Sequence, residues 1–266
     1  MNAQISSIAN KLPSESGFFK LDGEPYWLVV DGATKILYYI YVLGKPPYHS
    51  MPSERFPVYA RALREGATAI LGITDIAKAD KLVVPEAMGF HVGGVLSAIT
   101  GKQFVPIAKE TGTSKRYADD VTGREVDGRV SIRKSTGYAE AEMFVYGLRR
   151  GDRVVVIDTI ISTGGTAVAI IKELRSRGIE VLDFASYVSK VDYGGDSRIV
   201  EETGIEPRSL VNLSIKRVYD LDRTAYAETT VEKSRWWQQG ERTYLRFRKA
   251  WESLERQTRD FEISSV

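Results

Sequence analysis

The sequence predicts an α/β protein built on a doubly wound parallel β-sheet with helices on both faces. Short, almost continuously apolar runs alternate with segments of helical pattern, and we expect four strands over 81–85, 103–108, 153–157 and 179–188. Strands that are apolar along their whole length are buried on both faces, as in parallel sheets covered by helices. Ligands of such sheets bind beyond the carboxyl ends of the strands, so the functional residues are expected there.

The expected helices of this region end at glycine, which is the residue favoured just after a helix. Three such helices are predicted, over 58–65, 94–100 and 166–177, with Gly66, Gly101 and Gly178 directly after them. Near the N-terminus, 18–43 is rich in aromatic and β-branched residues around Asp22-Gly23 and Asp31-Gly32. Asp-Gly pairs favour hairpin turns, so short antiparallel strands are expected there.

The chain is expected to fall into three parts. These are an N-terminal strand region, 1–56, a core, 57–210, and a C-terminal extension, 211–266, with an amphipathic helix over 241–259. The extension is expected to pack on the main domain or on a second subunit. Within the core, 111–134 fits neither helical nor strand periodicity, and a loop of this length is usually a mobile functional lid or disordered.

Composition excludes several classes of function. Hydrophobic residues make up 43% and charged residues 27% of the chain, and the net charge of +2 gives no bulk attraction for nucleic acid or membrane. The absence of cysteine excludes disulfides and thiolate chemistry, and two histidines are too few for a histidine-based metal site. No stretch approaches the roughly 20 apolar residues of a membrane helix. With no secretion signal at the N-terminus, a cytoplasmic protein is expected.

The most informative segment is 154–166, which reads VVVIDTIISTGGT. It is typical of a buried strand, an acidic residue at the strand end, and a loop of small residues that opens a helix. The loop's backbone N–H groups and the positive end of the helix dipole suit a phosphate group, and the Asp158 carboxylate suits ribose hydroxyls. An ordinary strand–turn–helix with a threonine cap is the competing interpretation, which the whole combination disfavours. The segment is neither a Walker A loop nor a Gly-x-Gly-x-x-Gly turn.

This segment resembles the motif that binds phosphoribosyl pyrophosphate (PRPP) in type I phosphoribosyltransferases. The resemblance extends to 79–90, which is similar to the pyrophosphate loop of adenine phosphoribosyltransferases, and to 104–109, similar to the next strand of that family. Segments 135–138 and 151–154 resemble the archaeal-type purine enzymes in particular.

The resemblance implies the type I phosphoribosyltransferase fold with a small hood, here with a C-terminal helical extension. It implies a purine-salvage enzyme that transfers ribose 5-phosphate from PRPP to adenine, or to hypoxanthine or guanine, and releases pyrophosphate. Mg²⁺ is the implied cofactor, with no residue assigned as its direct ligand, and a homodimer is the implied assembly.

The implied site residues fall into three groups, with Asp158 as the catalytic residue. The PRPP-binding group is Asp158, Thr159, Ser162, Thr163, Gly164, Gly165 and Thr166. The pyrophosphate group is Glu86, Ala87, Met88, Gly89 and Lys109. Lys190 and Tyr193 are candidates for the base site, although a lysine after a strand is more often solvated and the case for Tyr193 stacking on the base is no stronger.

Two departures from the family pattern keep an alternative open. Thr159 stands where the family usually has a second acidic residue, and Met88 stands where adenine enzymes often have arginine. Both leave room for a non-enzymatic regulator that binds PRPP or a purine nucleotide on the same fold. The lack of a helix-turn-helix pattern in 1–43 argues against that alternative. A different base, such as orotate, uracil or xanthine, is a further alternative.

Overall fold

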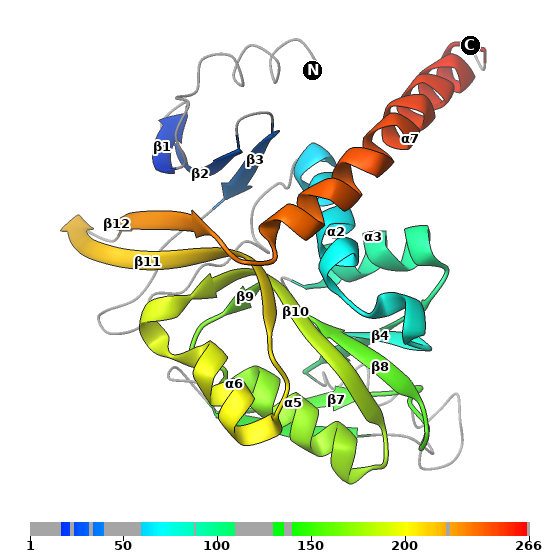
Figure 1. Ribbon diagram of the computed structural model, residues 1–266, viewed down its shortest axis with the longest axis vertical. Coiled ribbons are helices and arrows are strands. Elements are labelled where there is room, and N and C mark those ends of the chain that lie inside the picture. Colours follow the sequence, from blue (N-terminus) through cyan, green and yellow to red (C-terminus); the bar gives the residue numbers. More distant parts are fainter. Residues whose placement is uncertain are drawn as a thin grey trace.

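The computed structural model describes residues 17–21, 24–31, 34–39, 60–87, 89–109, 130–135, 140–221 and 224–264. Its main sheet has the strand order β12-β11-β10-β8-β4-β5-β7-β6, with β9 beside β10 (Figure 1). In chain order the strands are β4 (Lys81–Pro85), β5 (Gln103–Ala108), β6 (Val130–Ser135), β7 (Glu140–Val145), β8 (Arg153–Ile157), β9 (Ile160–Ile161), β10 (Glu180–Lys190), β11 (Arg208–Leu221) and β12 (Thr224–Lys233).

The five central strands, β11-β10-β8-β4-β5, are all parallel, and antiparallel strands flank them. The chain runs from β4 outward to β5, then returns past β4 to β8, β10 and β11. The winding therefore reverses between β4 and β8. In open α/β sheets, the crevice at this reversal, beyond the carboxyl ends of the strands, is where ligands bind.

Helices cover both faces of the sheet, as Figure 1 shows, with α2 and α3 on one side and α5 and α6 on the other. Their bounds are α2 (Ala60–Ile73), α3 (Phe90–Thr100), α5 (Gly165–Ser176), α6 (Gly195–Thr203) and α7 (Trp237–Ser264). Successive side chains of a strand enter different cores because a strand alternates its faces. In β4, Leu82 and Val84 pack with α2 and α3, whereas Val83 packs with α5. The predicted α/β class and its four parallel strands are confirmed.

The prediction that a helix ends before Gly66 is wrong. Helix α2 continues through Gly66 to Ile73. A Cβ at Gly66 would lie 2.7 Å from Cε1 of Tyr187, so the absence of a side chain lets the helix approach β10. Glycine serves close packing here and does not mark a helix end.

The prediction of an irregular segment over 111–134 is wrong at its C-terminal end, because Val130–Ser135 is strand β6, paired antiparallel with β7. Ile132 is 1% exposed in the core that faces α5. The rest of the segment, from 111 to 129, lies outside the described residues. Arg133 and Lys134 lie in this strand.

The antiparallel strands expected near the N-terminus form a separate small sheet, shown in blue in Figure 1. It contains β1 (Gly17–Leu21), β2 (Glu24–Asp31) and β3 (Thr34–Tyr39). Leu21 pairs with Glu24 and Asp31 with Thr34, so each connection has two residues, as in tight hairpins.

The C-terminal helix α7 packs against α2. The Tyr244 hydroxyl donates a hydrogen bond of 2.7 Å to Glu65, and the Gln239 side-chain amide donates one of 2.7 Å to the carbonyl of Gly72. Trp237 is 4% exposed in the same core. The boundary expected between 210 and 211 falls inside β11.

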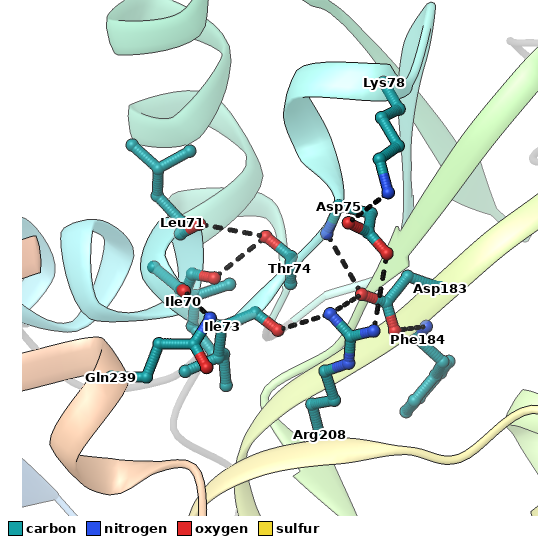
Figure 2. Close-up of polar contacts among 11 residues, drawn as sticks. Ile70, Leu71, Ile73, Thr74, Asp75, Lys78, Asp183, Phe184, Arg208 and Gln239 are labelled. Atoms are coloured by element: carbon teal, nitrogen blue, oxygen red, sulfur yellow. Dashed lines mark hydrogen bonds and ion pairs between the residues drawn. The ribbon is translucent and has the colours of Figure 1, made fainter.

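A charge cluster joins the end of α2 to the first residues of β10 and β11, away from the carboxyl edge of the sheet (Figure 2). Arg208, the first residue of β11, contacts the Asp183 carboxylate at 2.8 Å and donates to the carbonyl of Ile73 at 2.9 Å. The Asp183 side chain is 2% exposed and also accepts from the backbone N–H of Asp75 at 3.1 Å. Burial raises the pKa of Asp183 to about 6, and the charge of Arg208 opposes that shift.

Replacing Arg208 with methionine should lower the free energy of unfolding by about 3–5 kcal/mol, because it leaves the Asp183 carboxylate buried without its cation. The loss should grow as pH rises from 4 to 8. The pKa of Asp183 is raised in the folded protein, so the protonated carboxyl relieves the penalty only at low pH. Urea unfolding at several pH values measures both effects.

Arg235→Met is the matched control. Arg235 approaches the same Trp236 ring as Arg208, at 5.0 Å against 5.1 Å, but its ion pair with Glu206 is exposed. An exposed pair contributes about 0–1 kcal/mol. Equal losses in the two variants would contradict a special role for the charge cluster.

Candidate active site

The turn after β8 is held in place by the neighbouring strand. The backbone N–H of Asp158 donates to the carbonyl of Ala185 at 2.9 Å, which extends the β8–β10 pairing by one residue. The carbonyl of Thr159 then accepts from the N–H groups of Tyr187 and Val188 at 3.1 and 3.0 Å. The half-buried Asp158 therefore leaves the sheet at a fixed point, at the reversal between β4 and β8.

The loop of residues 162–166 leads directly into α5. Gly164 precedes the helix with φ +73°, a left-handed conformation that favours glycine, and offers no side-chain cap to the helix start. No acidic residue lies in the first turn of α5. The N–H groups at this start carry the positive end of the helix dipole, an arrangement suited to an anion such as phosphate.

Two buried hydroxyl groups in this turn have no hydrogen-bond partner among the described residues. They are Oγ1 of Thr159, a residue that is 6% exposed, and Oγ of Ser162. A buried polar group without a partner costs about 1–3 kcal/mol, so such groups call for an explanation such as a bound polar ligand. Both belong to the set predicted to contact PRPP.

The second predicted loop, residues 86–89, lies at the end of β4 beside the first. The N–H of Glu86 donates to the carbonyl of Ile107 at 2.7 Å, which ties the loop to β5. A Cβ on the buried Gly89 would lie 2.9 Å from the carbonyl oxygen of Pro85 and 3.4 Å from that of Ile157. Since Ile157 immediately precedes Asp158, Gly89 lies next to the start of the turn after β8, at the reversal of the winding.

The remaining predicted residues have different surroundings. Ala87 is exposed, Met88 lies outside the described residues, and Lys109 is exposed just beyond the end of β5. Lys109 therefore shares the carboxyl edge of the sheet with the two loops, because β5 is parallel to β4.

Lys190 is buried, which differs from the solvated lysine that is usual after a strand. It is the last residue of β10, is 3% exposed, and its Nζ lies 5.6 Å from the centre of the Tyr193 ring. Burial lowers the pKa of Lys190 to about 8. The two candidates for the base site are therefore in contact, at the same edge of the sheet as the loops.

The segment that follows Tyr193 was not predicted to contribute to the site. The backbone of Gly195, the first residue of α6, lies directly against the 162–166 loop. The next residue, Asp196, accepts a hydrogen bond from Ser189. The pair Gly194-Gly195 was the available signal, since adjacent glycines allow a close backbone approach.

A cavity of about 520 Å³ lies on another side of α6 and contains none of the predicted site residues. It is lined by α6, the start of β11 and the chain between β12 and α7, including Asp196, Asn212 and Trp236. The loops at the carboxyl edge, and not this cavity, gather the residues with a recognisable chemical use.

A magnesium ion fits this site only if the substrate supplies most of its ligands. Among the described residues, no group of three or more histidine, aspartate or glutamate side chains is arranged to hold a metal. Mg²⁺ commonly keeps several waters and binds through one or two carboxylates and substrate phosphates. One carboxylate, Asp158, beside two hydroxyls is a donor set of that kind.

No helix within the described ranges has the length and apolar character that a membrane crossing requires.

Known proteins similar to this chain are purine phosphoribosyltransferases. A hypoxanthine/guanine phosphoribosyltransferase from Methanobacterium lacus is 37% identical over 154 residues, which are 58% of this chain and 73% of that protein. Its counterpart from Methanocaldococcus infernus is also 37% identical over 154 residues, 58% of this chain and 76% of that protein. No model of a known protein family matches the chain.

A solved structure supports the same fold. The adenine phosphoribosyltransferase from Rhodothermus marinus superposes with a TM-score of 0.50 at 22% identity, covering 64% of this chain and 90% of that one. Together with the sequence relatives, the fold and the site place the chain in the type I purine phosphoribosyltransferase family, a family of enzymes. The predicted family and fold are confirmed.

Replacing Thr159 with valine should raise the free energy of unfolding of the ligand-free protein by about 1–2 kcal/mol, because it removes a buried hydroxyl for which the described ranges offer no hydrogen-bond partner. The same change at Thr68, whose hydroxyl donates 2.6 Å to the carbonyl of Arg64, should instead cost about 1 kcal/mol. Urea unfolding of both variants makes the comparison. If Thr159→Val lowers the free energy of unfolding as much as Thr68→Val does, the Thr159 hydroxyl makes a hydrogen bond in the folded protein and the prediction is wrong.

Proposed function

We propose that the chain transfers ribose 5-phosphate from PRPP to a 6-oxopurine, hypoxanthine or guanine, and releases pyrophosphate in purine salvage. The observation that carries this proposal is the geometry after β8, where one turn holds a carboxylate, the start of α5 and two buried hydroxyls that have no partner in the described part of the chain. Each group matches one part of ribose 5-phosphate. The relatives named hypoxanthine/guanine phosphoribosyltransferase support the same assignment.

In this proposal the 5-phosphate lies against the N–H groups of Thr163 to Thr166, where the helix dipole and the threonine hydroxyls favour it. The Asp158 carboxylate accepts hydrogen bonds from the ribose hydroxyls, and Thr159 and Ser162 contribute their buried hydroxyls. A charged acceptor makes stronger hydrogen bonds than a neutral one. Asp158 is therefore the group with the largest expected effect on the reaction.

The departing pyrophosphate lies between Glu86 to Gly89 and Lys109. This assignment rests on the position of both segments at the carboxyl edge beside Asp158. Bond breaking at C1 of the ribose places positive charge on the sugar and negative charge on pyrophosphate. The protein's tasks are to position the two partners and to stabilise these charges, so no covalent nucleophile is needed. Asp158 is the residue that would lie beside a Mg²⁺ ion bound with PRPP, and the ion would supply positive charge to the leaving group.

The purine base lies beside Lys190 and Tyr193. The buried Lys190 ammonium is a hydrogen-bond donor only, so it matches the exocyclic oxygen of hypoxanthine or guanine. The exocyclic amino group of adenine is itself a donor and does not match. The tyrosine ring supplies an apolar face next to the ammonium. The resemblance to the family also leads us to propose a homodimer in the cytoplasm.

Pyrophosphate release from PRPP and Mg²⁺ with each base in turn tests the proposal. We expect release with hypoxanthine and guanine, and less than about one-tenth of that rate with adenine, since a single mispaired polar group discriminates strongly. Asp158→Asn should lower kcat/KM by about 100-fold or more. Asp80→Asn removes an exposed carboxylate that pairs with Arg153 and serves as the matched control. PRPP binding without release with any base would instead favour a regulator.

The dependence of kcat/KM on pH tests the role of Lys190. Because burial lowers its pKa to about 8, the ammonium is present at pH 7 and lost at higher pH. The ratio of kcat/KM of the wild-type protein to that of Lys190→Met, with hypoxanthine as the base, should therefore fall between pH 7 and 9.5. The base's own ionisation is common to both proteins and cancels in the ratio. A ratio that stays constant over this range would contradict the donor role.

A further inference from the structure

The first turn of α6 lies against the 162–166 loop with no side chain between the two backbones. A Cβ added to Gly195 would lie 2.1 Å from the carbonyl oxygen of Ser162 and 2.8 Å from the backbone nitrogen of Gly164. A Cβ added to Gly164 would in turn lie 2.6 Å from the carbonyl oxygen of Gly195. Separations below 3.0 Å are too short for a real Cβ contact, so only glycine fits at both positions in this arrangement.

A side chain one turn further along α6 reaches the same loop. Nη1 of Arg198 donates a hydrogen bond of 3.5 Å to the carbonyl oxygen of Thr163. The guanidinium is oriented by Glu202, which accepts from its Nε at 2.8 Å and also pairs with Lys172 of α5. Arg198 therefore connects the loop, α6 and α5 through one guanidinium group.

This contact bears on the direction of the loop's N–H groups. The carbonyl of Thr163 belongs to the same peptide unit as the N–H of Gly164, and the two point in opposite directions because the peptide is planar. Holding the carbonyl toward α6 turns the N–H away from α6. Arg198 also places a positive charge on the side of the loop that faces α6.

We infer that α6 is the positioning element of the 162–166 loop, with Gly195 as the surface that fixes its position and Arg198 as the tether that orients the Thr163–Gly164 peptide. The inference rests on the proposed function for its ligand, a sugar phosphate, and goes beyond it by assigning roles to two residues that do not touch that ligand. Since α6 follows directly on Lys190 and Tyr193, the same element joins the phosphate side of the site to the base side.

The binding of ribose 5-phosphate, measured by calorimetry, is the first test. Gly195→Ala should weaken binding by at least about 10-fold, since a displacement of about 1 Å at a positioned site can cost on the order of 100-fold. Gly94→Ala is the matched control, because nothing lies within 4 Å of a Cβ at Gly94 in α3. It should leave the affinity within about two-fold, as an exposed glycine-to-alanine change in a helix affects mainly helix stability.

An arginine pair keeps the inference testable if Gly195→Ala does not fold. Arg198→Met should weaken ribose 5-phosphate binding by about three- to ten-fold, the range expected for a lost hydrogen bond near a charge. Arg175→Met is its control. Arg175 of α5 also donates to a backbone carbonyl, that of Thr203 in α6, but at the end of the helices away from the loop. Equal affinities in the two arginine variants would overturn the tether.

Turnover separates this inference from the proposed function. In an active enzyme, Gly195→Ala and Arg198→Met should raise KM for PRPP and leave KM for the base unchanged, a division that general destabilisation does not produce. If the wild-type protein binds ribose 5-phosphate but releases no pyrophosphate, the proposed reaction fails while the binding tests still decide the role of α6. Wild-type affinity in both Gly195→Ala and Arg198→Met overturns the inference, as does an absence of ribose 5-phosphate binding by the wild-type protein.

Discussion

The turn from β8 into α5 is the constraint on which the rest of the site depends. It places a carboxylate at the end of a buried strand and the positive end of a helix a few residues later. A strand in the middle of the sheet gives this turn a rigid base, because β8 pairs with β10 on one side and β4 on the other. The pairing with β10 continues past the end of β8, because the backbone groups of Asp158 and Thr159 also form hydrogen bonds to that strand. These bonds fix the first two residues of the turn.

The other parts of the site are arranged around this turn by topology. The winding of the sheet reverses between β4 and β8, and the helices that follow these two strands, α3 and α5, lead away in opposite directions to β5 and β10. The 86–89 loop can therefore approach the end of β8 closely, as the short separation between Gly89 and the carbonyl of Ile157 indicates. On the opposite side, β10 ends at the buried Lys190, and α6 then returns to the 162–166 loop. The parallel strands of one sheet thus gather, at one edge, the residues proposed to contact the phosphate, the pyrophosphate and the base.

Much of this arrangement could be predicted from the sequence because its signals are local. The residues 154–157 are all apolar, and the Asp, Ser, Thr and Gly residues that follow carry the chemistry of the turn. Strand β6 was missed because Arg133 and Lys134 interrupt its apolar residues, and its burial depends on pairing with β7. Gly66 was misread because its reason for being glycine is the Tyr187 ring, which no local pattern records. The contact of Gly195 with Ser162 and the pairing of Arg208 with Asp183 likewise join residues distant in sequence.

The account's central claim is that the amide groups at the start of α5 hold a sugar phosphate while Asp158 holds the sugar. A crystal structure of the protein with PRPP and Mg²⁺, or with the nucleotide product, tests it most directly. The account predicts that the 5-phosphate lies against residues 163–166 and that the ribose hydroxyls lie within hydrogen-bond distance of the Asp158 carboxylate. A ligand bound elsewhere, for instance in the cavity beside Trp236, with the turn after β8 left without it, would contradict the claim.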